Sequence, residues 1–172
     1  MEEERKRVMI RIPDTVCKLI DLFAGRTHTS RPDVIIDACR QFYTKICTDE
    51  MDMLKIFEAE NAPKEIALAA YHEQISETVD ALLEDYDAYA KDSRSEVSIL
   101  VVFPPILLTL IENTMARTMA FKNRQYYIRA AFMFLFRTQS AIAEHVKTMN
   151  DFVIANDVEK EISSLREKLR KD

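Results

Sequence analysis

Glycine is almost absent from this 172-residue chain, in which Gly25 is the single copy. Proteins built from extended sheets need glycine at many tight turns, where the backbone adopts conformations that other residues rarely reach. Hydrophobic residues make up 48% of the chain, which is enough to form a core. The composition therefore predicts a mostly helical folded protein, with the size of one domain or two small ones.

The one clear strand signal lies near the N-terminus, where residues 7–13 read RVMIRIP. Valine and isoleucine alternate there with arginine and methionine, which is the pattern of a strand with one buried face. The apolar face would hold Val8, Ile10 and Ile12. The other face would hold Arg7, Met9 and Arg11. Pro13 ends the strand because it cannot donate a hydrogen bond to a neighbouring strand.

Helical spacing of apolar residues follows directly after Pro13. We expect this first helix to stop at Gly25, with the glycine as a left-handed C-cap. After a polar turn, Ser30 has the position of an N-cap, and Pro32 falls in the first turn of a second helix. The predicted order is strand, helix, turn, helix.

The same order returns later in the chain. Residues 98–105 read SILVVFPP, and Pro104 lies 91 positions after Pro13. Asn123, a second expected N-cap, lies 93 positions after Ser30. An internal repeat of about 45 residues is the economical interpretation. Between the two copies we expect two helices, separated by a break at residues 61–63.

Charge is distributed unevenly along the chain, whose net charge is −5. Residues 1–45 carry a net charge of +2, residues 46–96 of −10, and residues 97–172 of +3. The two mildly basic ends are compatible with nucleic acid as a partner, whereas the acidic middle would repel it. If the chain binds DNA, the acidic helices must project away from the duplex.

The segment RVMIRIPDTVCKLIDLFAGRTHTSRPDVIIDACRQF resembles the ribbon-helix-helix family of DNA-binding proteins, the Arc and MetJ type of repressor. The resemblance covers residues 7–45 well and residues 97–137 weakly. It implies a mostly α fold with short β-ribbons, in which two ribbon-helix-helix units are joined by an acidic helical segment. The expected divisions are 1–46 for the first unit, 47–95 for the acidic linker, 96–138 for the second unit and 139–172 for a helical tail.

The resemblance also implies a function, which is sequence-specific transcription regulation, repression among the options, by an antiparallel ribbon in the major groove of double-stranded DNA. Base edges would be read by Arg7, Met9 and Arg11. The DNA backbone would be contacted by Arg5, Lys6, Ser30 and Arg31, with Arg124 as a possible phosphate contact from the second unit. The second strand has Ser98, Leu100 and Val102 at the reading positions. We therefore expect it to serve association, packing against the acidic helices or against another chain.

Two pairings of the strands are open. The two repeats of one chain can pair as a pseudo-dimer, or each can pair with its counterpart in a homodimer. We favour the homodimer, because it would place four arginines in one groove. The alternative function is a protein-interaction or oligomerisation module that no longer binds DNA, with the acidic helices 47–91 contacting a protein partner.

Other classes of function have little support in the sequence. The histidines His28, His72 and His145 are scattered singly, and a chain with one glycine has no glycine-rich phosphate loop. We therefore expect no enzyme activity, no cofactor and no metal. No apolar run is long enough to span a bilayer and no signal peptide is recognisable, so we expect a cytoplasmic protein without membrane contact.

Overall fold

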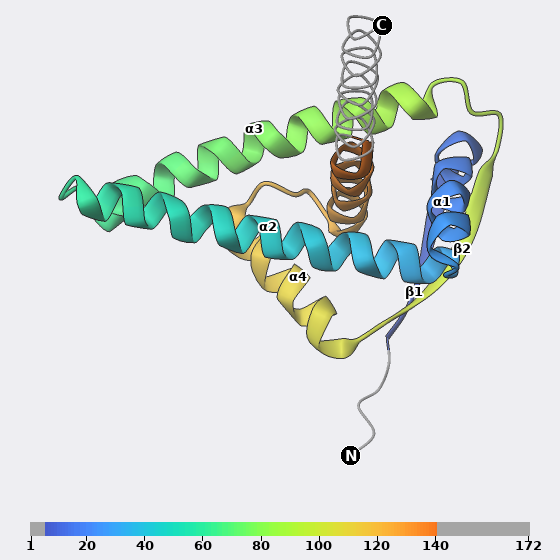
Figure 1. Cartoon of the computed structure of the whole chain (residues 1–172), viewed down its shortest axis with the longest axis horizontal. Coiled ribbons are helices and arrows are strands. Elements are labelled where there is room, and N and C mark those ends of the chain that lie inside the picture. Colours follow the sequence, from blue (N-terminus) through green and yellow to red (C-terminus); the bar gives the residue numbers. More distant parts are fainter. Residues whose placement is uncertain (1–5, 141–172) are drawn as a thin grey trace, which may run out of the picture. The chain divides into compact units, whose positions relative to one another are not determined.

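Helices dominate the computed structural model, which describes residues 6–140 (Figure 1). The elements in chain order are β1 (Lys6–Pro13), α1 (Asp14–Thr27), α2 (Arg31–Ala59), α3 (Lys64–Ala90), β2 (Glu96–Phe103) and α4 (Pro105–Thr118). A further helix begins at residue 124 and continues to residue 140. The expectation of a mostly helical chain with a short ribbon is confirmed. Residues 6–135 belong to one unit, and a second unit begins at Phe136.

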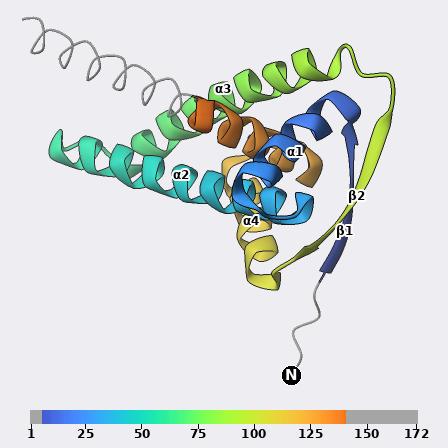
Figure 2. The ribbon, with the colours of Figure 1, turned by 45° about the vertical axis from the view of Figure 1, so that its right-hand side comes forward.

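The two strands pair with each other within the chain, in antiparallel register from Lys6 opposite Phe103 to Pro13 opposite Glu96. Figure 2 shows them side by side at one edge of the unit. Our preference for pairing between two chains is therefore wrong for this ribbon. The reason is that α2 and α3 form an antiparallel hairpin. The end of α3 therefore lies near β1, and β2, which follows α3, pairs with it.

The return of the chain is fixed by polar contacts between the start of α1 and the residues that precede β2. The amide of Asp14 donates to the carbonyl of Ser95 and to the hydroxyl of Ser93, both at 3.0 Å. The Ser93 hydroxyl also bonds to the Asp14 carboxylate. Nearby, the Thr15 hydroxyl donates to the Tyr89 carbonyl at 2.6 Å.

One face of the ribbon is part of the core. The helices all lie on the same side of the two strands (Figures 1 and 2). Alternate residues of both strands are buried on that side, namely Ile10, Ile12, Ile99, Val101 and Phe103. Burying a side chain of this size contributes roughly 1.5–3 kcal/mol, so the inner face fixes which side of each strand points outward.

Aromatic rings fill the centre of the unit, between α2 and the helix that begins at residue 124. Phe42, Phe121 and Tyr127 lie with ring centroids 5.0–6.1 Å apart. The Tyr127 hydroxyl donates to the Cys39 carbonyl at 3.4 Å, and burial raises the pKa of Tyr127. This packing joins the two halves of the sequence in one core.

Helix α1 does not end at its glycine. Gly25 is helical, and the left-handed residue is His28, with φ of 54°. The amides of His28 and Thr29 both donate to the carbonyl of Ala24, and the Thr27 hydroxyl donates to the Phe23 carbonyl. The expected glycine C-cap is therefore wrong, because these bonds carry the helix through to Thr27, and histidine is one of the residues that tolerate the left-handed region.

Helix α2 extends past the expected boundary of the first unit. It runs unbroken from Arg31 to Ala59, through residue 46, where the first unit was expected to end. The break predicted at residues 61–63 is confirmed, with Asn61 at φ of 55°. At 1.5 Å per residue, α2 is about 43 Å long.

Equivalent details recur at positions 91 apart, beyond the two strands. Met119 ends α4 in the left-handed conformation, as His28 ends α1, and its amide donates to the Met115 carbonyl. Thr118 donates its hydroxyl to the carbonyl four residues earlier, as Thr27 does. These recurrences support the internal repeat at the level of backbone geometry.

Candidate nucleic-acid interface

The outer face of the ribbon carries the three predicted base-reading residues. Arg7, Met9 and Arg11 are all exposed, with Met9 at 53%. They alternate with the buried residues of β1, so the burial of Ile10 and Ile12 holds them outward. Opposite them in the register lie Val102, Leu100 and Ser98, in that order. The face thus consists of six side chains, three from each strand.

Neither Arg7 nor Arg11 takes part in an ion pair among residues 6–140. Lys6, at the start of β1, is also exposed and adds a third positive charge. Arg5 lies outside the described residues. A guanidinium with no intramolecular acceptor keeps all its donors available for an external acceptor.

The outer face of β2 differs from our expectation. Leu100 is 45% exposed and Val102 is 38% exposed, and no described element covers them. Of the two expected coverings, packing against the acidic helices is wrong, because those helices lie on the inner side of the ribbon. Packing against another chain stays a prediction. Together with Met9, these residues make an exposed apolar strip beside the two arginines.

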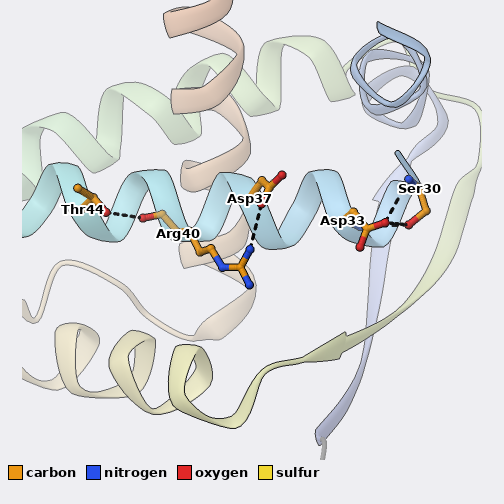
Figure 3. A network of polar contacts seen from close by, with 5 residues as sticks. All are labelled: Ser30, Asp33, Asp37, Arg40 and Thr44. Carbon is orange, nitrogen blue, oxygen red and sulfur yellow. Dashed lines mark hydrogen bonds and ion pairs between the residues drawn. The ribbon is translucent and has the colours of Figure 1, made fainter. Parts of the chain in front are cut away.

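Ser30, a predicted backbone contact, is the N-cap of α2 as expected, and Figure 3 shows its contacts. Its hydroxyl accepts from the Asp33 amide at 3.3 Å and donates to the Asp33 carboxylate, whose pKa this bond lowers. The Asp33 carboxylate also accepts from the Ser30 amide. The helix N-terminus therefore already holds an anion of the chain's own, which competes with a phosphate for the same dipole.

Arg31, the next predicted backbone contact, lies against Asp21 of α1. Its Nε is 2.6 Å from one carboxylate oxygen and its Nη2 is 2.9 Å from the other. This bidentate contact lowers the pKa of Asp21. Both side chains are close to half exposed, so the pair is accessible to solvent and to a competing anion.

Arg124 occupies the corresponding position in the second half of the chain and pairs with Glu112 of α4. Asp21 and Glu112 lie 91 positions apart, and Arg31 and Arg124 lie 93 apart. Arg129, on the same helix as Arg124, is held differently. Its guanidinium lies 5.1 Å from the ring centroid of Tyr86 and 5.7 Å from that of Tyr126.

Sequence reasoning missed the two acids that neutralise these arginines, Asp21 and Glu112. Each precedes its arginine by at least ten residues across a turn, a separation for which helical spacing gives no signal. It also missed Gln125, whose amide nitrogen donates to the Met9 carbonyl at 3.4 Å. That contact attaches the centre of β1 to the helix that begins at residue 124.

No group of His, Cys, Asp and Glu side chains within residues 6–140 is arranged to hold a metal ion. No helix in the same range is long and apolar enough to cross a membrane. His145 and the tail from residue 141 lie outside the described residues. Comparisons of the chain with protein families, with curated proteins and with solved structures find no match.

Proposed function

We propose that this chain is a sequence-specific DNA-binding regulator that inserts the β1–β2 ribbon into the major groove. The observation that carries the proposal is the pair of exposed arginines, Arg7 and Arg11, on the outward face of a ribbon whose inner face is fixed in the core. The major groove admits a two-stranded ribbon, and arginine matches the O6 and N7 acceptors of guanine.

The proposed units are two ribbon-helix-helix motifs within one chain, each made of a strand and two helices. The first comprises β1, α1 and the first half of α2. The second comprises β2, α4 and the helix that begins at residue 124. The recurrence of strand ends, left-handed helix ends and ion pairs at nearly constant offsets supports this division.

Part of the acidic segment lies away from the ribbon, although Glu96 begins β2 itself. The turn between α2 and α3, at residues 60–63, lies at the far end of both helices from the ribbon (Figure 1). Since α2 is about 43 Å long and charges in solution are screened beyond about 10 Å, acidic residues near this turn exert little repulsion on a duplex at the ribbon.

The test is selection of preferred sites from random-sequence DNA at low salt with the full chain. Arg7→Ala/Arg11→Ala is compared with Lys55→Ala/Lys64→Ala, which removes the same charge beside the α2–α3 turn. We expect the parent chain and the lysine variant to enrich the same sites and the arginine variant to enrich none. Equal enrichment by all three proteins would contradict the proposed ribbon contact.

A second candidate function is a protein-interaction module, which the α2–α3 hairpin favours. Ile56 and Ile66 are more than half exposed there. A pocket of about 520 Å³ lies between the helices and is lined by Leu54, Phe57, Glu58, Asn61, Ala62, Lys64 and Ala67. On this hypothesis a basic partner binds the acidic helices. Retention of a protein partner by the full chain, with no DNA affinity at low salt, would favour it.

A further inference from the structure

The register of the ribbon has a symmetry that the side chains do not share. Residues 91 positions apart are equivalent in the repeat, so Leu100 is the equivalent of Met9. In the ribbon Met9 also lies directly opposite Leu100. A local two-fold axis therefore passes between these two residues, as it would between identical residues of a symmetric dimer.

The outward side chains break this symmetry at both ends. The equivalent of Arg7 is Ser98, and the equivalent of Arg11 is Val102. Because of the antiparallel register, one end of the face presents Arg7 beside Val102, and the other presents Arg11 beside Ser98. Each end thus has one arginine, but the two arginines are not related by the axis.

We infer that a single chain recognises a DNA sequence that is not its own reverse complement, with two guanines contacted from β1 and thymine methyl groups contacted from β2. This inference rests on the proposed function as a DNA-binding regulator. It assigns Leu100 and Val102 a recognition role, since an exposed aliphatic side chain in the major groove finds its best partner in the thymine methyl group.

A palindromic site would be poorly matched by this face. In such a site every guanine bound by an arginine has a symmetry mate, and those mates face Ser98 and Val102. Valine offers no donor to the O6 and N7 atoms of guanine, so these acceptors lose water without gaining a hydrogen bond. The second half of a palindrome is therefore disfavoured at the Val102 position and gains little at the Ser98 position.

The spacing of the expected contacts follows from strand geometry. Arg7 and Arg11 are four residues apart on one face, which corresponds to roughly 13 Å along β1. Measured against the spacing of base pairs, this is about three to four base pairs. Met9 and Leu100 lie between them, and Val102 lies beside Arg7. The site should therefore have guanines at its two ends, a thymine at its centre and a second thymine next to the guanine at the Arg7 end.

The test uses the full chain and a variant that restores the symmetry, Ser98→Arg/Leu100→Met/Val102→Arg. Sites are selected from a random duplex library, and complexes with one chain per duplex are isolated by sedimentation. We expect the parent chain to enrich an asymmetric motif and the variant to enrich a palindrome. The parent should bind its motif at least about tenfold more tightly than a palindrome built from either half, the ratio expected from one bidentate contact.

Three outcomes separate the possibilities. A palindrome selected by the parent chain in one-to-one complexes overturns the asymmetry and leaves the proposed function intact. No retention of DNA by the parent chain at low salt overturns both. A control variant, Thr48→Arg/Gln74→Arg, adds two arginines on the hairpin instead of on the ribbon. We expect it to select the parent motif. If it selects a palindrome, added positive charge alone changes the selected site, which overturns the assignment of the asymmetry to the ribbon side chains.

Discussion

Arg31 contacts Asp21 through two parallel hydrogen bonds, of 2.6 and 2.9 Å, across the turn that separates α1 from α2. The equivalent pair in the second half of the chain joins Arg124 to Glu112. Both arginines are among the predicted phosphate contacts of this chain. In this chain each of them already pairs with a carboxylate. A phosphate would have to compete with that carboxylate for the guanidinium group.

Removing the acids should therefore raise affinity for DNA. In Asp21→Asn/Glu112→Gln both arginines lose their intramolecular anions, and each becomes available for a phosphate. We expect tighter binding to random-sequence DNA at low salt, and a steeper dependence of log affinity on log salt concentration, by about one per arginine released. A titration at several salt concentrations measures this. Asp52→Asn/Glu58→Gln removes equal charge on the hairpin and should leave the slope unchanged.

The shape of the arginine head group should matter at the ribbon as well as its charge. Arg7→Lys/Arg11→Lys keeps both charges but loses the planar fork that matches guanine. We expect nearly unchanged affinity for random-sequence DNA and a loss of about 1–3 kcal/mol per residue for the selected site. Competition binding with both duplexes checks this. An equal loss on both duplexes would mean that the arginines contribute charge alone.

The ion pair between Arg117 of α4 and Glu50 of α2 should be more important for folding than the surface pairs. Its N–O distance is 2.8 Å, and the Glu50 side chain is only 12% exposed. Arg117→Ala leaves that carboxylate buried without its partner, which we expect to cost about 1–2 kcal/mol. Arg40→Ala, which breaks the exposed Arg40–Asp37 pair, should cost less than about 1 kcal/mol.

Thermal or denaturant unfolding measures the stability of Arg117→Ala and Arg40→Ala relative to the parent chain. Glu50→Gln/Arg117→Ala removes the charge together with its partner and should recover part of the stability lost in Arg117→Ala. A double variant less stable than Arg117→Ala would contradict this explanation. The stability lost in Arg117→Ala would then come from packing of the arginine side chain and not from the unpaired carboxylate.

Stability should fall in acid partly because of Asp14. The hydrogen bond from Ser93 holds the pKa of this carboxyl below its ordinary value of 3.8. A carboxyl whose pKa is lowered by folding stabilises the folded state above its unfolded pKa, and this contribution is lost as the pH falls through the folded pKa. Melting temperatures of the parent and Ser93→Ala should therefore differ most at neutral pH and converge as the pH falls through the lowered pKa of Asp14.

Asp14→Asn is the companion variant for this measurement, because it removes the titrating group and keeps a hydrogen-bonding side chain. It should also flatten the dependence of melting temperature on pH in acid. A Ser93→Ala difference that stays constant from neutral to acid pH would show that the serine acts only through its bonds to the backbone of Asp14 and Ser95.

Local features of the fold could be predicted from the sequence because short-range chemistry determines them. Pro13 and Pro104 end the strands, Ser30 caps α2, and the break at residues 61–63 lies where proline interrupts a helix. The end of α1 could not be predicted in this way, since the hydrogen bonds of Thr27 and His28 extend the helix beyond Gly25.

The sequence patterns could not predict which distant segments contact one another. The alternation in β1 fits equally well against β2 or against a second β1, and only the antiparallel return of α3 decides between them. The expected packing of the outer face of β2 against the acidic helices was wrong for a related reason. Leu100 and Val102 are apolar, but the strand has only one face toward the core, and Ile99, Val101 and Phe103 occupy it.

The intrachain ribbon has a consequence for how the protein responds to dilution. A ribbon made from two chains falls apart when the protein is scarce, because its stability is inseparable from protomer concentration. Here Lys6–Pro13 and Glu96–Phe103 are covalently joined, so the ribbon exists wherever the chain is folded. Its outer face is therefore complete in a single molecule. On the proposed function, the occupancy of a DNA site at low protein concentration should rise in proportion to the first power of that concentration.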